Sequence, residues 1–264
     1  MIDVDATVAA LTARPSSTAL LVDFDGSLAP FVPHAQDARP LPGVPDVIER
    51  LVAGLGRVAI VSGRPLSYLT RHLPIDGLGY AGLYGMESSI GGEYVVDARV
   101  EPYLVAVAAA TAELESQLPP DLVEPKAGIS VTLHWRPAPE LADEIVALAH
   151  DVSVRHGLGE LHTRYAVELR PPIAIDKADP TRALVDGFDV AAFAGDDYGD
   201  LPAFAELRRL LADGRLQQAI RVGVTTDEAP PELADAVDLV VDGPQGLLDL
   251  LVRVADEIGK PVGR

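Results

Sequence analysis

The stretch LLVDFDGSLAP, residues 20–30, decides the fold class of this chain. A short run rich in Leu and Val is typical of a buried strand in a parallel sheet, and Gly26 and Pro30 end it. Open α/β sheets bind their ligands beyond the carboxyl ends of such strands. Because strand side chains alternate between faces, Asp23 and Asp25 can serve one site only if the chain bends there, which Gly26 permits. Taken alone, the same letters also fit a strand that ends in an ordinary polar turn.

Strand and helix signals alternate on both sides of the middle of the chain. Such alternation predicts an α/β fold with a Rossmann-like, doubly wound parallel sheet. The expected strands cover 19–23, 57–61, 78–83, 190–194, 220–224 and 239–241, and the expected helices cover 44–55, 65–73 and 244–258.

The middle of the chain has a different pattern. Gly91-Gly92 predicts a hairpin over 88–96, and residues 129–133 and 165–170 alternate as strands with one exposed face should. Helical spacing follows Pro102 and Pro139, over about 102–118 and 139–152. We therefore expect a core of residues 1–85 and 172–264, interrupted by a smaller α+β cap domain at 86–171.

Composition narrows the possible functions. The 264 residues are 48% apolar, contain no cysteine and carry a net charge of −19. A core of that size excludes a disordered chain, and the missing cysteines exclude disulfides and thiolate metal sites. The acidic balance argues against nucleic-acid and anionic-membrane partners. No apolar run approaches the ~20 residues of a membrane span, and the first residues lack the basic start of a signal peptide. We expect a cytoplasmic protein, and a monomer.

Four polar clusters follow predicted strands or the exit from the middle segment. They are Asp23 with Asp25, then Ser62-Gly63-Arg64, then Lys177, then Asp196-Asp197 with Asp200. Strands of a parallel sheet end at one edge, so these clusters should converge. A carboxylate nucleophile, a second carboxyl for proton transfer, hard oxygen ligands for Mg²⁺ and a lysine for phosphoryl oxygens are together what phosphoryl transfer needs.

The order of these clusters resembles the haloacid-dehalogenase (HAD) superfamily of phosphatases. The matching stretches are DFDGSLAP, VAIVSGRP, IDKADP and FAGDDYGD, which together span the predicted core. The resemblance implies Asp23 as the nucleophile and Asp25 as the general acid and base. It implies Ser62, Gly63 and Lys177 as phosphate binders. It also implies a Mg²⁺ site formed by Asp23, the Asp25 carbonyl and Asp196, with Asp197 or Asp200 in support.

Within that superfamily the chain resembles the trehalose-6-phosphate phosphatase family. The resemblance extends to YAGLYGME, to residues 126–136 and to VELRPP. It implies a phosphorylated sugar as the substrate, and it gives as candidates for the sugar side Arg64, Glu87, Lys126, His134, Arg136, Glu168 and Arg170. The chain departs from the family pattern at Leu83-Tyr84-Gly85, at Ala178 and at 198–201, which leaves the particular sugar open.

Alternatives remain for several of these residues and for the function. Ser62 would also serve as a helix N-cap, Arg64 would pair with a surface carboxylate, and Lys126, Arg136 and Arg170 would fit a solvated face. Trehalose 6-phosphate hydrolysis competes with the same reaction on a sucrose, mannosylglycerate or pseudo-disaccharide phosphate. Outside that class stand a flavodoxin-like phosphate-accepting receiver and an inactive relative acting as a partner subunit.

Overall fold

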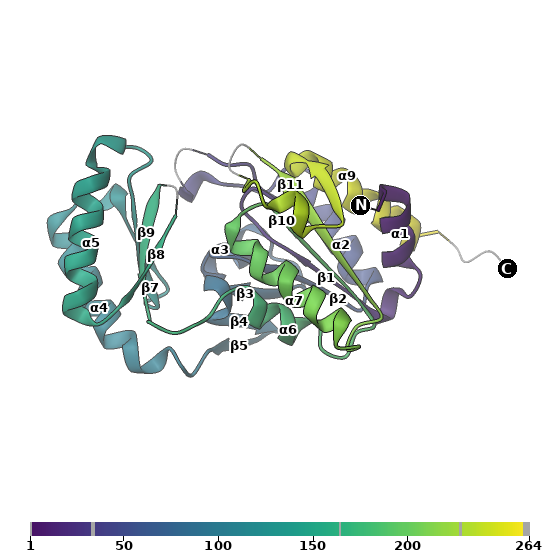
Figure 1. The fold of residues 1–264 in the computed structure, drawn as a ribbon, viewed down its shortest axis with the longest axis horizontal. Helices are drawn as coiled ribbons and strands as arrows, with labels where there is room; N and C mark the ends of the chain where they lie inside the picture. Colours follow the sequence, from purple (N-terminus) through teal and green to yellow (C-terminus); the bar gives the residue numbers. More distant parts are fainter. Residues whose placement is uncertain (1, 33–34, 164, 227–228, 261–264) are drawn as a thin grey trace. The chain divides into compact units, whose positions relative to one another are not determined.

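The computed structural model describes residues 2–32, 35–163, 165–226 and 229–260, and it shows a mixed α/β fold with a central, mostly parallel sheet (Figure 1). The chain forms two compact units. Over their described residues, the core unit comprises the chain up to Phe31, Ala38–Val95 and the chain from Ile175 on, and the inserted unit comprises Val32–Asp37 and Val96–Ala174.

The core unit contains an eight-stranded sheet in the order β12-β11-β10-β1-β2-β3-β4-β5. Six neighbouring strands are parallel, and β4 joins β3 in the antiparallel sense. All five residues of β1 are buried, since it lies in the middle of the sheet between β10 and β2. The strands are β1 Thr18–Val22, β2 Arg57–Val61, β3 Gly79–Gly82, β4 Glu87–Ile90, β5 Glu93–Val96, β10 Val190–Gly195, β11 Gln218–Thr225 and β12 Leu239–Asp242.

Helices pack in two groups against this sheet. On one side, α9 contacts both α1 and α2; on the other, α7 contacts α6 and α8 (Figure 1). Alternate residues of β1, Ala19 and Leu21, pack with Phe204 of α7, as the two-sided burial of a central parallel strand requires. The helices are α1 Val4–Thr12, α2 Val44–Gly54, α3 Leu66–His72, α6 Ala178–Leu184, α7 Leu201–Ala212, α8 Leu233–Ala236 and α9 Gly243–Ile258.

The hairpin predicted over 88–96 forms, but it belongs to the core unit and not to the middle one. Its strands β4 and β5 extend the large sheet beyond β3. The compact units therefore divide after Val95 and after Ala174, whereas the predicted boundaries were 86 and 171. The local pattern shows that two segments pair with each other, but it carries no information on which sheet they join.

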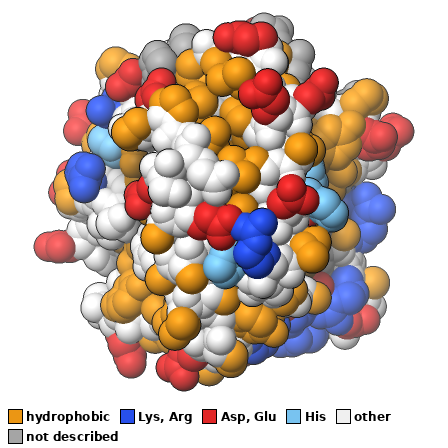
Figure 2. Space-filling view, turned by 90° about the vertical axis from the view of Figure 1, so that its left-hand side faces the viewer, with side chains coloured by type: hydrophobic (Ala, Val, Ile, Leu, Met, Phe, Trp, Pro, Cys, Tyr) orange, Lys and Arg blue, Asp and Glu red, His pale blue; other side chains and the backbone are white. Residues whose placement is uncertain are grey.

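The inserted unit has a four-stranded antiparallel sheet in the order β6-β7-β9-β8. Helices α4 and α5 pack together over one face, with Val131, Leu133, Val167 and Leu169 beneath them. Figure 2 looks onto the outer side of these helices, where acidic, basic and apolar side chains lie interspersed. The elements are α4 Leu104–Gln117, α5 Ala142–His156, β6 Val123–Lys126, β7 Ser130–His134, β8 Gly159–His162 and β9 Ala166–Arg170.

Short 3-10 turns connect several elements, and two of them, at Leu83–Gly85 and Tyr198–Asp200, contribute to the candidate site. The others are Pro15–Ser17, Ala35–Asp37, Glu101–Tyr103, Pro120–Leu122 and Pro139–Leu141. Within the described residues, every helix is too short or too polar to pass through a bilayer.

Candidate active site

The bend expected after β1 is present. Gly26 has φ +76°, and its N–H donates to the carbonyl of Ala29 at 2.8 Å, while the carbonyl of Phe24 accepts from Leu28 and Ala29. A Cβ on Gly26 would lie 2.2 Å from Oδ2 of Asp196. Gly26 therefore serves twice: it allows the left-handed bend, and it leaves room for a carboxylate from the end of β10.

Lys177 lies between two buried carboxylates. Its Nζ is 2.8 Å from Oδ1 of Asp23 and 2.7 Å from Oδ1 of Asp200. The three residues are at most 4% exposed. Burial favours the neutral amine, but the charges of Asp200 and Asp23 outweigh it and raise the pKa of Lys177. Burial raises the pKa of Asp23; Lys177 opposes this effect and Asp200 adds to it. A charged lysine beside the predicted nucleophile is the result.

Asp200 also organises the turn that follows β10. Its Oδ2 accepts from the N–H of Asp196 at 2.8 Å and of Asp197 at 3.0 Å. Asp197 in turn accepts from the N–H of Gly199 at 2.8 Å, so the two carboxylates form a capping box around the turn. This arrangement explains a fully buried carboxylate at position 200: it orients Lys177 and the 196–199 backbone together.

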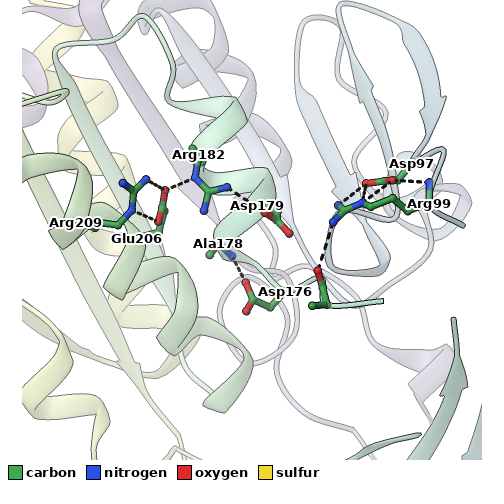
Figure 3. Close-up of polar contacts among 9 residues, drawn as sticks. Asp97, Arg99, Asp176, Ala178, Asp179, Arg182, Glu206 and Arg209 are labelled. Carbon is green, nitrogen blue, oxygen red and sulfur yellow. Dashed lines mark hydrogen bonds and ion pairs between the residues drawn. The ribbon is translucent and has the colours of Figure 1, made fainter. Parts of the chain in front are cut away.

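The helices behind this pair are clamped together. Asp176 accepts from the N–H of Ala178 at 2.8 Å at the start of α6, directly beside Lys177. Further along, Glu206 of α7 binds Arg182 of α6 at 2.6 Å and Arg209 at 2.7 Å (Figure 3). Because α6 follows Lys177 and α7 follows Asp200, this clamp holds in place the two helices next to the lysine–carboxylate pair.

The carboxylates of Asp23, Asp197 and Asp200 form a cluster in which one oxygen from each lies within 4.8 Å of the others. Asp196 lies close by, with Ser27 Oγ 3.5 Å and Thr226 Oγ1 3.3 Å from its two oxygens. Burial, then the charges of Asp23 and Asp200, raise the pKa of Asp196 to about 10. Burial and the charge of Asp200 raise that of Asp197 to about 6.

Four carboxyl groups with a single lysine among them would carry an uncompensated negative charge if all of them were ionised. Oxygen donors of this kind are the ligands that Mg²⁺ and Ca²⁺ prefer, and a bound divalent ion would allow the buried acids to ionise together. The donor set therefore fits a hard divalent cation. Asp23, Asp197 and Asp200 supply the clustered oxygens, although both oxygens of Asp200 also accept hydrogen bonds from Lys177 and from backbone amides.

Arg64 contacts a carboxylate within the site. Its guanidinium forms a bidentate ion pair with Asp25, in which the Nε–Oδ2 and Nη2–Oδ1 distances are both 2.7 Å. The same guanidinium lies over the Tyr68 ring, 4.5 Å from its centroid. Arg64 thus pairs with a carboxylate, as one of the alternatives had it, and this carboxylate belongs to the predicted general acid, whose side chain is 28% exposed. Ser62 is 1% exposed and its Oγ accepts from the N–H of Arg64 at 3.2 Å.

Glu87, predicted to contact the sugar, has both oxygens engaged inside the core unit. Oε1 accepts from the N–H of Leu66 at 2.6 Å, at the first residue of α3, and Oε2 accepts from the Tyr94 hydroxyl at 2.9 Å. The side chain is 2% exposed. It acts as a helix cap supplied from a neighbouring strand, and this role alone accounts for its burial.

The other predicted sugar-side residues lie in the inserted unit, and most of them share one sheet face. Strand register places Thr132 beside Glu168 and Lys126 beside Ser130, on the face opposite α4 and α5. Lys126 Nζ is 3.4 Å from Glu168. On the same face, His134 Nε2 is 2.8 Å from Glu124, and Arg170 is 8% exposed. Arg136, just beyond β7, stacks over the Tyr165 ring at 4.4 Å.

Three buried oxygens on that face have no hydrogen-bond partner among the described residues: Oγ of Ser130, Oγ1 of Thr132 and Oε1 of Glu168. An unpaired buried polar atom costs about 1–3 kcal/mol. Neighbouring unpaired oxygens beside a lysine are therefore a signal for a polar ligand or for ordered water.

Two residues that contact Asp196 were not predicted as site residues from the sequence. Ser27 follows the DxDG motif directly, and Thr226 follows β11. The rule that ligands gather at strand carboxyl ends could have selected Thr226, since β11 is another parallel strand of the sheet. Nothing in the one-dimensional pattern separates Ser27 from an ordinary turn serine.

The fold, with its central, mostly parallel sheet, is that of a HAD-like α/β protein: a haloacid dehalogenase-like hydrolase from Bacteroides thetaiotaomicron superposes with a TM-score of 0.61 at 16% identity, covering 90% of this chain and 99% of that one. A family model for trehalose-phosphatases matches residues 21–236, and the chain belongs to that family.

Similar proteins support this assignment. A trehalose-phosphate phosphatase of Mycobacterium avium is 28% identical over 257 residues, which cover 93% of this chain and 64% of the relative. One from Mycobacterium tuberculosis is 31% identical over 198 residues, 70% of this chain and 50% of the relative. This chain thus spans between half and two thirds of the length of those relatives.

A solved structure extends the likeness to the whole fold. The C-terminal domain of trehalose-6-phosphate phosphatase from C. albicans superposes with a TM-score of 0.77 at 17% identity, covering 97% of this chain and 98% of that one. At that identity the match speaks for the fold alone.

Proposed function

We propose that this chain is a Mg²⁺-dependent phosphatase that hydrolyses trehalose 6-phosphate to trehalose and phosphate through an aspartyl-phosphate. The observation that carries the proposal is the buried Asp23 carboxylate held against Lys177 beside Asp25 and the acidic cluster. The names of the similar proteins supply the substrate.

The proposed reaction has two displacements at phosphorus. In the first, an oxygen of Asp23 forms a bond to phosphorus while the bond from phosphorus to the sugar oxygen breaks, and Asp25 gives its proton to that oxygen. In the second, Asp25 takes a proton from a water molecule whose oxygen attacks phosphorus, and the bond to Asp23 breaks to release phosphate. Both oxygens of Asp25 accept hydrogen bonds from Arg64, so one of these two bonds has to break before Asp25 can donate a proton.

Charge neutralisation comes from several groups in this site. Lys177 offsets the negative phosphoryl oxygens from the Asp23 side, and the Ser62 hydroxyl offers a further donor. Held by Asp23, Asp196 and Asp197, Mg²⁺ would stabilise the charge on the transferring group.

We assign sugar selection to the inserted unit, in the role of the cap domain predicted at 86–171. A disaccharide presents many hydroxyls, which are both donors and acceptors. The unpartnered oxygens of Ser130, Thr132 and Glu168, with Lys126 among them, offer complementary groups. His134, Arg136 and Arg170 extend this polar surface. Sucrose, mannosylglycerate and pseudo-disaccharide phosphates remain the alternative substrates of the same reaction.

The test is phosphate release from trehalose 6-phosphate with and without Mg²⁺, for the wild-type chain and for Asp23→Asn. Release that needs Mg²⁺ and disappears in the variant supports both chemistry and substrate. Release from one of the other phosphorylated sugars, with none from trehalose 6-phosphate, keeps the mechanism and replaces the substrate. No turnover of any ester favours the receiver or inactive-subunit alternative.

We also propose a cytoplasmic monomer, as expected from the sequence. Sedimentation of the full chain at several concentrations checks the monomer, and a concentration-dependent mass would contradict it.

A further inference from the structure

The segment Leu83-Tyr84-Gly85 has an unusual backbone. Its three residues have φ of 50°, 61° and 99°, and among the described residues only Ala127 is another non-glycine residue with a left-handed φ. A bulky side chain in this region is strained, and such strain persists where the surroundings impose it, often at functional sites. Two consecutive large residues here are therefore a reason to ask what their side chains do.

Contacts tie this segment to the motif residues. The N–H of Tyr84 donates to the carbonyl of Ser62 at 3.0 Å, and that of Leu83 donates to the carbonyl of Arg64 at 3.0 Å. A Cβ on Gly85 would lie 2.9 Å from Pro180, in the helix that follows Lys177. The strained turn thus packs against two of the segments assigned to phosphate binding.

The Tyr84 ring lies between two further turns. A Cβ on Gly63 would lie 2.8 Å from the Tyr84 hydroxyl oxygen, and a Cβ on Gly199 would lie 3.6 Å from its ring carbon Cε1. The hydroxyl end is therefore over the Ser62-Gly63 turn, while the ring edge is beside the turn that holds Asp197. The side chain is partly exposed, whereas Ser62 and Lys177 are buried.

We propose that the hydroxyl of Tyr84 donates a hydrogen bond to a non-bridging oxygen of the phosphate group bound between Ser62 and Lys177. The inference rests on the proposed phosphatase function and adds a substrate-contacting residue to it. A phosphate group carries three strong acceptor oxygens. A phenol over the glycine of the phosphate-binding turn supplies a donor there, and the backbone hydrogen bonds of Leu83 and Tyr84 to Arg64 and Ser62 hold its residue in place.

Tyr84→Phe tests the hydroxyl alone, because the ring stays between Gly63 and Gly199. In the Mg²⁺-loaded full chain we expect kcat/KM for the phosphate ester to fall about 10- to 100-fold, the range for a hydrogen bond to a charged group. The melting temperature without ligand is measured alongside. Tyr103→Phe is the matched control: it removes a phenol hydroxyl in the inserted unit, outside every motif, and should leave kcat/KM unchanged.

A second readout does not depend on turnover. Inorganic phosphate with Mg²⁺ should raise the melting temperature of the wild-type chain, and Tyr84→Phe should need about tenfold more phosphate or above for the same rise. Tyr84→Asn, which suits a left-handed φ better, should be at least as stable as the wild type yet lose the same phosphate protection.

The two readouts separate the failure of this inference from that of the proposed function. Wild-type phosphate release with equal kcat/KM and equal phosphate protection in Tyr84→Phe overturns the role of Tyr84 and leaves the phosphatase intact. Absence of turnover in the wild type overturns the phosphatase, and the phosphate-protection comparison then still decides on Tyr84. A wild-type chain that phosphate does not protect overturns the inference outright.

Discussion

The carboxylate of Asp196 fills the space that a side chain at position 26 would occupy. This close approach gives a prediction at the residue scale. Gly26→Ala places a Cβ 2.2 Å from Asp196 Oδ2 in a backbone with φ +76°. We expect the free energy of unfolding to fall by the backbone penalty of about 1–2 kcal/mol plus the cost of displacing Asp196, and Mg²⁺ affinity to fall with it. Urea unfolding and a Mg²⁺ titration measure the two effects.

Gly187→Ala is the control for that change. Gly187 has φ +83°, but a Cβ there would meet nothing within 4 Å, so only the backbone penalty applies. Equal loss of stability in both variants, with Mg²⁺ binding retained in Gly26→Ala, would show that the contact with Asp196 is unimportant.

Lys177 gives a second prediction at this scale, because it is the cation between Asp23 and Asp200. Lys177→Met leaves two buried carboxylates facing each other without a partner, and breaking a buried pair costs about 3–5 kcal/mol. We expect that loss in urea unfolding without Mg²⁺. Lys260→Met removes an exposed lysine paired with Glu257 and should cost under about 1 kcal/mol. A similar small loss for both would contradict the pairing.

At the scale of helices and strands, the sequence was most informative for the central elements. β1, β2, β10, α2 and α9 lie within a residue or two of their predicted bounds, because buried parallel strands and amphipathic helices have distinctive periodicity. The missed strands β6 and β8 are both edge strands of the smaller sheet. An edge strand is short and partly solvated, so its pattern resembles a loop; in β6 a proline adds to this.

The candidate site follows the same division. Convergence of Asp23, Lys177 and Asp196 could be predicted, since the topology of a parallel sheet brings strand ends together. The ion pair between Arg64 and Asp25 and the capping of α3 by Glu87 could not be predicted, because both depend on side-chain directions in three dimensions.

The clamp between α6 and α7 predicts a pH effect. Hydrogen bonds from Arg209 and Arg182 lower the pKa of Glu206 to about 2. A carboxyl whose folded pKa lies below its unfolded value of about 4.3 adds stability above that value and loses it as the pH falls toward 2. Since both arginines are more than 40% exposed, screening reduces the gain to about 1–2 kcal/mol.

Comparison of the wild type with Glu206→Gln measures that gain. The difference in free energy of unfolding should be full at pH 6 to 7, shrink between about pH 5 and pH 2, and vanish below. Asp213→Asn, which removes an exposed partner of Arg209, should show less than half the difference. A difference between wild type and Glu206→Gln that does not change with pH would mean that Glu206 acts through packing and not through its charge.

At the scale of the whole molecule, the clustered carboxyl groups of the core unit make the free energy of unfolding depend on metal binding. In the metal-free protein the pKa of Asp196 is about 10, so this carboxyl is neutral at pH 7. Asp196→Asn imitates that neutral state and should leave the metal-free melting temperature nearly unchanged. Mg²⁺ should stabilise the wild type by about 2.7 kcal/mol at 100 times its Kd and give the variant little or nothing.

Because binding displaces the Asp196 proton, Mg²⁺ affinity should rise as the pH increases from 6 to 9. Thermal unfolding at matched ionic strength, with NaCl in place of MgCl₂ as the control, measures each of these effects. If NaCl stabilised the wild type as much as MgCl₂ does, the cluster would respond to screening alone, and the metal site proposed here would be wrong.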